Sequence, residues 1–174
     1  WCAAGLTAEP LANGYYSIVT GITIIDGQMT EFTNAADKEV DYIRYERTLP
    51  LVNVWMPLYV PFSIPMSEEF LENYDIAYFN DVRGYDDNND YTIDRTVIEL
   101  IKVTNPNATL KANYPLVIRA KNEAAKNLVF ALTNVKLHKA EDKSVTVNST
   151  AYSYEIKGTY KTHATLTSNQ RVLG

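Results

Sequence analysis

Residues 53–65 read NVWMPLYVPFSIP, an apolar and aromatic stretch that is interrupted by Pro57, Pro61 and Pro65. A helix does not accommodate this pattern, because each internal proline removes a backbone donor and clashes with the preceding turn. A long central strand does not accommodate it either, so we expect a strand that bends out of its sheet at a proline-fixed corner. The stretch therefore indicates a β-rich domain.

The remainder of the chain supports this interpretation, because short β-branched and aromatic runs alternate with turn residues. Strands are expected at 15–20, 22–25, 40–48, 74–82, 92–103, 114–120, 128–132, 135–137, 144–148 and 151–156. Ser67 is a suitable N-cap, and Glu68 and Glu69 suit the first turn of a helix, so one short helix is expected at 67–73. The sequence predicts an all-β fold, a two-sheet and jelly-roll-like β-sandwich with this single short helix.

The chain of 174 residues is long enough for one domain with its own core. We expect residues 1–13 to be a lead-in segment and residues 14–174 to form a single β-sandwich domain. The strand at 92–103 is apolar on both faces, which is typical of a strand deep in a structure.

Composition excludes several classes of partner. The net charge is −5 and the 16 basic residues are scattered singly, so nucleic-acid binding lacks its electrostatic footprint. No apolar run approaches the ~20 residues that a membrane-spanning helix needs, and membrane insertion is not expected. The single cysteine, Cys2, permits no internal disulfide.

Several segments resemble a β-rich domain of unassigned function from secreted and cell-surface proteins of gut Bacteroidetes, where it often stands beside leucine-rich-repeat or immunoglobulin-like modules. The segments that carry the resemblance are 55–62 (WMPLYVPF), 74–81 (YDIAYFND), 94–99 (DRTVIE), 110–120 (LKANYPLVIRA) and 158–160 (GTY). The resemblance implies an extracellular location on the bacterial outer surface. In the family resembled, the Gly-Thr-Tyr strand is usually followed by a further short strand, so the resemblance also implies that the C-terminal end of this domain is incomplete. It implies no catalytic residues, because the family has none to carry over.

The acidic segment 86–94, DDNNDYTID, is the sharpest candidate for a metal site. Oxygens at the spacing of a calcium loop come from Asp86, Asn88, Asp90 and Asp94. However, Tyr91 stands where a glycine normally permits the turn, and Val97 stands where a bidentate carboxylate would close the shell. The sequence therefore favours the alternative, a solvated hairpin loop of turn-forming Asp and Asn residues. Apart from this possible calcium ion, we expect no cofactor.

Aromatic residues beside this loop give the candidate ligand-binding site. Tyr85 and Tyr91 flank the acidic loop, and their rings could stack on a sugar while Asp86 and Asn88 bond its hydroxyls. Trp55 and Tyr59 are a second aromatic pair, for which core or corner packing is the favoured interpretation.

Neither His138 nor His163 lies in a pattern that suggests catalysis or zinc binding, and both are expected at the surface. Paired carboxylates of a glycosidase could come from Asp75, Asp81, Glu99 and Glu155, but exposed or ion-paired strand residues are the simpler interpretation. We therefore do not expect an enzyme.

The expected function is that of a non-catalytic module of an exported bacterial surface protein. It would serve adhesion or recognition, with a host or dietary glycan or a surface protein as partner, or space neighbouring modules. One alternative is a surface-fibre subunit that assembles by strand addition. A carbohydrate-active enzyme accessory domain is a further alternative. The ligand's identity and the oligomeric state are left open by the sequence.

Overall fold

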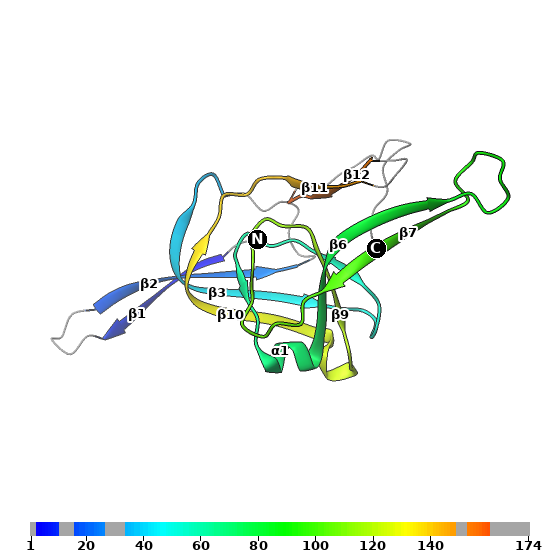
Figure 1. Ribbon diagram of the computed structural model, residues 1–174. Helices are drawn as coiled ribbons and strands as arrows, with labels where there is room; N and C mark the ends of the chain where they lie inside the picture. The colour runs from blue at the N-terminus through cyan, green and yellow to red at the C-terminus, as the bar shows by residue number, and fades with distance from the viewer. Residues whose placement is uncertain (1–2, 11–15, 27–33, 149–152, 161–174) are drawn as a thin grey trace.

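The computed structural model describes residues 3–10, 16–26, 34–148 and 153–160 (Figure 1). Cys2 and His163 lie outside these residues. The strands are β1 Ala3–Pro10, β2 Tyr16–Ile25, β3 Lys38–Thr48, β4 Met56–Leu58, β5 Ile64–Pro65, β6 Tyr74–Tyr85, β7 Arg95–Lys102, β8 Thr109–Leu110, β9 Leu116–Ala120, β10 Asn127–Leu137, β11 Lys143–Asn148 and β12 Ser153–Gly158. The helices are α1, Glu68–Asn73, and the 3₁₀ helix η1, Glu123–Lys126.

Two four-stranded sheets form the body of the fold, in the orders β1-β2-β3-β10 and β4-β9-β6-β7. Strands β2 and β3 run parallel, whereas the other neighbours in these two sheets are antiparallel. Two further pairs, β11-β12 and β5-β8, complete the described strands. The expected all-β, two-sheet sandwich is confirmed. Part of the expected lead-in segment forms β1, which pairs with β2 at the edge of the first sheet.

The core lies between the two sheets, because alternate residues of their strands face the same layer. Ile43 of β3 and Leu128 of β10 come from the first sheet, and Ile76 of β6 and Ile118 of β9 come from the second; all four are fully buried. Phe62 fills the centre, with its ring centroid 6.1 Å from those of both Tyr45 and Phe130. Each buried aliphatic or aromatic side chain of this size contributes roughly 1.5–3 kcal/mol of hydrophobic stabilisation.

The proline-broken stretch runs along the edge of the second sheet, as its sequence predicts. Strand β4 is only three residues long and pairs with β9 alone, so the missing N–H of Pro57 interrupts no central ladder. The chain then bends inward, and Val60 and Phe62 become core residues before β5 pairs with β8.

The expected short helix is confirmed as α1. The Ser67 hydroxyl accepts a 3.0 Å hydrogen bond from the backbone N–H of Phe70, which satisfies one of the free donors of the first turn. No helix among the described residues has the length and apolar character needed to cross a lipid bilayer.

A third layer covers part of the outer face of the second sheet. Val145 and Val147 of β11, with Tyr154 and Ile156 of β12, pack on a small cluster of Ala77, Phe79, Val82 and Val117. The β11-β12 hairpin therefore extends the sandwich on one side (Figure 1).

The sequence-based prediction of a deep strand at 92–103 is wrong. Strand β7 is an edge strand, and nearly all of its residues are exposed, with Ile101 52% exposed. A strand that is apolar on both faces is ordinarily covered on both. Here neither face is fully covered, because β7 and the outer half of β6 extend beyond the sandwich.

Candidate functional site

The β6-β7 hairpin forms an arm that projects from the body of the fold, with its loop at the far end (Figure 1). The register shifts between Phe79 and Asp81, which marks a β-bulge where the arm leaves the sandwich. Bulges bend a strand and increase its twist, so this one directs the hairpin outward. Beyond it, Tyr85 pairs with Arg95 and the loop of residues 86–94 begins.

The acidic loop is organised by its own hydrogen bonds. The Asp86 carboxylate accepts from the backbone N–H groups of Asp90 at 3.1 Å and Tyr91 at 2.7 Å. Asn88 Oδ1 also accepts from the Asp90 N–H, Asp90 Oδ1 accepts from the Thr92 N–H, and Asp94 Oδ2 accepts from the Asp87 N–H. Such side-chain-to-backbone bonds are the means by which Asp and Asn shape turns. These hydrogen bonds restrain the conformation of the loop.

The candidate calcium oxygens are engaged in this network. All four predicted ligands, Asp86, Asn88, Asp90 and Asp94, accept hydrogen bonds from loop N–H groups. Hydrogen bonds from the Thr92 side chain and then from its backbone N–H lower the pKa of Asp90. Within the described ranges, no group of three or more His, Cys, Asp or Glu side chains is placed to hold a metal ion. The geometry is that of a hydrogen-bonded hairpin loop.

The two candidate tyrosines lie in different environments. Tyr91 is 98% exposed, and its backbone φ of 68° is in the left-handed region, which is unfavourable for a side chain of this size. Tyr85 lies at the end of β6, and the guanidinium of Arg95 covers its ring at 4.2 Å from the centroid. Arg95 is held in turn by Asp87 at 2.9 Å. Tyr91 therefore offers an open ring, whereas one face of Tyr85 is occupied.

The carboxylates weighed for hydrolysis lie in three different settings. Asp81 and Glu99 are register partners on β6 and β7, and both contact Arg83, at 2.6 and 3.3 Å. Asp75 is buried and faces three cations. Glu155 is exposed on β12. The Arg83 guanidinium lies between the Asp81 and Glu99 carboxylates and occupies the position that a sugar would need.

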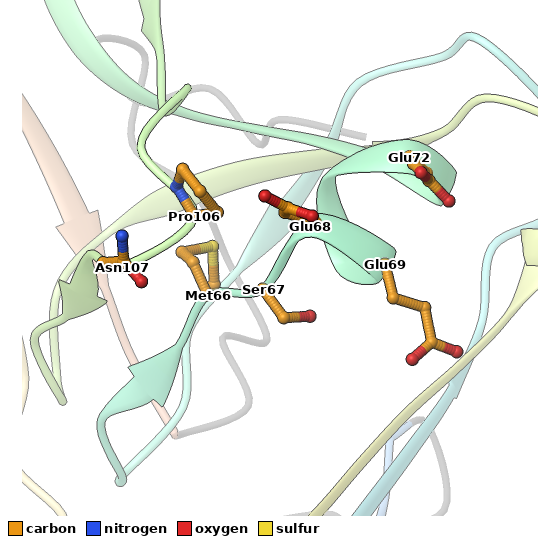
Figure 2. Close-up of a pocket in the computed structure, with 7 residues that line it drawn as sticks. All are labelled: Met66, Ser67, Glu68, Glu69, Glu72, Pro106 and Asn107. Carbon is orange, nitrogen blue, oxygen red and sulfur yellow. The ribbon is translucent and has the colours of Figure 1, made fainter.

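An open depression of about 590 Å³ lies where α1 meets the turn before β8 (Figure 2). It is lined by Met66, Ser67, Glu68, Glu69, Glu72, Pro106 and Asn107. Figure 2 shows the three glutamate side chains leaving the helix in different directions, so their carboxylates do not converge on one point. No sequence motif indicates this depression, and its diverging carboxylates do not form a binding site.

The second aromatic pair, Trp55 and Tyr59, is engaged in packing, as the sequence favours. Trp55 lies under the Arg119 guanidinium at 4.7 Å from the centroid, next to the outer cluster. The Tyr59 ring lies 4.7 Å from that of Tyr160, and its hydroxyl donates to the Glu141 carbonyl at 2.8 Å.

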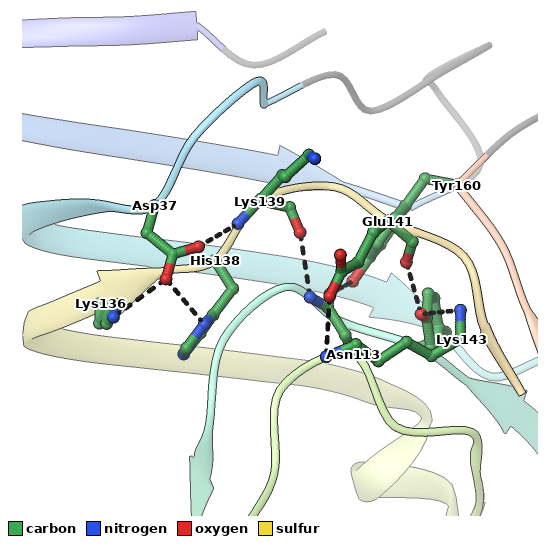
Figure 3. A network of polar contacts seen from close by, with 9 residues as sticks. Asp37, Asn113, Lys136, His138, Lys139, Glu141, Lys143 and Tyr160 are labelled. Carbon is green, nitrogen blue, oxygen red and sulfur yellow. Dashed lines mark hydrogen bonds and ion pairs between the residues drawn. The ribbon is translucent and has the colours of Figure 1, made fainter. Parts of the chain in front are cut away.

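The histidine that the structure describes belongs to a structural network. His138 Nδ1 is 3.5 Å from Asp37, which also pairs with Lys136 at 2.9 Å (Figure 3). The backbone N–H of Lys139 and then the Lys136 ammonium lower the pKa of Asp37. These contacts connect the end of β10 to the segment before β3.

The chain matches no family model, no curated protein and no solved structure in comparisons with known proteins.

Proposed function

We propose that this protein is a non-catalytic recognition module of an exported bacterial surface protein, and that the tip of the β6-β7 arm contacts a glycan on a host or dietary surface. The observation that carries the proposal is Tyr91, almost fully exposed at the end of a projecting hairpin. An exposed tyrosine ring offers an apolar face on which a sugar ring can stack, and burial of that face on binding is favourable.

The loop geometry supports a binding role for this ring. A left-handed backbone at a large residue is unfavourable by roughly 1–2 kcal/mol, so the surrounding bonds must hold it in place. Asp86 does this by accepting from the Tyr91 N–H. A backbone that is fixed before binding loses less entropy when its side chain meets a ligand, which favours a weak ligand such as a sugar.

A glycan array probed with the protein and with Tyr91→Ala tests this function. We expect bound glycans whose signals are lost in Tyr91→Ala and reduced in Tyr85→Ala. Val129→Ala, which truncates another exposed apolar residue on β10, is the matched control and should retain binding. Unchanged binding by Tyr91→Ala would exclude the arm as the recognition site.

Strand addition at β7 is a second candidate function, which the exposure of this edge favours. Strand β7 pairs only with β6 among the described strands, and it exposes Val97, Ile98 and Ile101. An unpaired apolar edge can accept a strand from another chain. If β7 accepts a strand from another copy, the average molecular mass measured by light scattering should increase with protein concentration. Val97→Lys should abolish this increase. A monomer at all concentrations, which also fails to bind added β7 peptide, would exclude it.

A further inference from the structure

A row of polar side chains crosses the outer face of the second sheet at the end opposite to the arm tip. It follows the strand order, with Lys102 on β7, Asp75 on β6, Arg119 on β9 and Trp55 directly before β4. The register places Asp75 opposite Arg119. We call these four residues, together with Lys121, which directly follows β9, the basic row.

The basic row shares its face with the cluster beneath the β11-β12 hairpin. Ala77 and Val117 are buried under that hairpin, and they lie two residues along their strands from Asp75 and Arg119. Side chains of residues two apart on a strand point to the same face of the sheet. The basic row therefore lies on the same outer face as the cluster, next to the part that the β11-β12 hairpin covers. Lys102, Arg119 and Lys121 keep 50%, 28% and 37% of their side chains exposed.

The basic row contains more positive charge than its single carboxylate can neutralise. Asp75 is 7% exposed, and its Oδ2 accepts from Arg119 Nε at 2.8 Å and Nη2 at 2.6 Å. Its Oδ1 lies 3.3 Å from Lys102 Nζ and 3.5 Å from Lys121 Nζ. Three cations thus share one carboxylate, which leaves an excess of two positive charges.

A structural ion pair does not explain this excess. Arg119 alone would neutralise Asp75, and each additional cation adds repulsion between like charges. In the part of the chain that the structure describes, no other carboxylate forms an ion pair with any of the three cations. The protein as a whole carries a net charge of −5, so a group of converging cations is also unusual in this sequence.

The donors of the basic row are held in place. The Trp55 ring stacks against the Arg119 guanidinium at 4.7 Å, and the two Arg119 contacts to Asp75 fix its plane. Lys121 is also bound to the Leu71 carbonyl at 2.5 Å. Each lysine ammonium has three N–H donors, so both retain donor capacity for an incoming anion.

We propose that the basic row binds the carboxylate or sulfate groups of an acidic polysaccharide. The row lies on an open sheet face and follows the spacing of neighbouring strands, about 4.8 Å, which suits an extended polymer with repeated charges. The indole of Trp55 at one end has one face against Arg119 and is only partly buried, so its remaining exposed surface adds apolar contact for a sugar ring, which favours a saccharide over an acidic peptide. The site is separate from the arm and does not depend on Tyr91.

Titration calorimetry with defined probes tests the proposal. The probes are polygalacturonate as the carboxylate polymer, dextran sulfate as the sulfate polymer, neutral dextran and polyglutamate, each at low and at physiological ionic strength (about 0.15 M). The variant is Lys102→Gln/Lys121→Gln, which retains Arg119 and Asp75. Its control is Lys38→Gln/Lys111→Gln, which removes the same charge from exposed residues elsewhere. Thermal unfolding verifies that both variants are folded.

We expect one or both acidic polysaccharides to bind, the row variant to lose about tenfold or more in affinity, and the control and Tyr91→Ala to bind as the parent does. The more tightly bound polymer identifies the anionic group. Equal losses of affinity in the row variant and in the control would show that only the net charge of the protein matters, and would overturn the proposal. It would also be overturned by no binding of either polymer, or by polyglutamate binding as tightly as the saccharides.

Discussion

The hydroxyl of Tyr160 donates a 2.7 Å hydrogen bond to Oδ1 of Asn113, which is 3% exposed (Figure 3). The same Asn113 donates through Nδ2 to the Lys139 carbonyl at 3.0 Å, and its backbone N–H donates to the Val60 carbonyl. Asn113 therefore connects β12's C-terminal extension, the segment after β10 and the proline-broken stretch. A buried amide of this kind stabilises only when its partners are complete.

Tyr160→Phe should destabilise the fold by about 1–3 kcal/mol, because it leaves the buried Asn113 oxygen without its donor. Urea unfolding at neutral pH measures the loss. Tyr91→Phe removes a hydroxyl from a fully exposed ring and should change stability by less than about 0.5 kcal/mol. Equal stability of the two variants would show that the Tyr160–Asn113 bond has no net effect.

Gly158→Ala should be strongly destabilising because of the Tyr59 ring. A Cβ at position 158 would lie 2.1 Å from Cδ2 and Cε2 of Tyr59, and that ring is held by its hydroxyl bonds to Glu141 and Lys143. We expect a cost of about 1–3 kcal/mol or more in urea unfolding.

Gly84→Ala is the matched control for this prediction. Its Cβ would lie 2.5 Å from the terminal Cδ1 of Ile93 and 3.3 Å from Cγ1 and Cγ2 of the same side chain, which can rotate away, so the cost should be clearly smaller. Combining Gly158→Ala with Tyr59→Leu should recover part of the loss, because the two residues are in contact. Strict additivity would contradict the steric explanation.

Asp86→Ala should loosen the loop without unfolding the protein. Because the Asp86 carboxylate accepts from the N–H of Tyr91, hydrogen exchange of this amide should accelerate by about tenfold, whereas that of Asp90 should accelerate less because its N–H also donates to Asn88 Oδ1. Global stability should change by less than about 0.5 kcal/mol, since the loop is exposed. Asp87→Ala removes the same charge but neither acceptor, so its exchange at Asp90 and Tyr91 should match the parent. Similar acceleration in both variants would contradict the proposed role of Asp86.

Asp75 should contribute to stability in a pH-dependent manner. Burial by itself raises its pKa, but hydrogen bonds from Arg119 and Lys102 outweigh burial and lower the pKa below the ordinary value. A carboxyl whose pKa is lowered by folding stabilises the protein above the unfolded-state pKa of about 3.9, and this contribution is lost as pH falls through the folded-state pKa.

Asp75→Asn should therefore be less stable than the parent by about 1–3 kcal/mol at pH 7, because three cations lose their shared carboxylate. The difference should decrease below about pH 4 as the parent's Asp75 becomes protonated. Urea unfolding from pH 2 to pH 7 measures it. A stability difference that is independent of pH would contradict this account.

Much of the fold could be predicted from local patterns in the sequence. The helix at 67–73 follows from the Ser67 cap and the acidic first turn, and the loop at 86–94 follows from its Asp and Asn residues. These features depend on neighbouring residues alone. The exposure of β7 could not be predicted this way, because apolar residues on both faces do not distinguish a covered strand from one that projects.

The basic row was missed for a related reason. Asp75, Lys102 and Arg119 are far apart in the sequence, and only the register of β6 with β7 and β9 brings them together. A signal was nevertheless present, since Asp75 and Arg119 are charged residues inside the apolar stretches 74–79 and 116–120. A charge at such a position usually has a partner on a neighbouring strand.

The most direct test of recognition by the arm is an NMR titration of the ¹⁵N-labelled protein with a glycan identified on the array. The account predicts that amide shift changes concentrate in residues 85–95, and that Tyr91→Ala abolishes them. Shift changes that concentrate elsewhere on the sandwich, or persist in Tyr91→Ala, would contradict it.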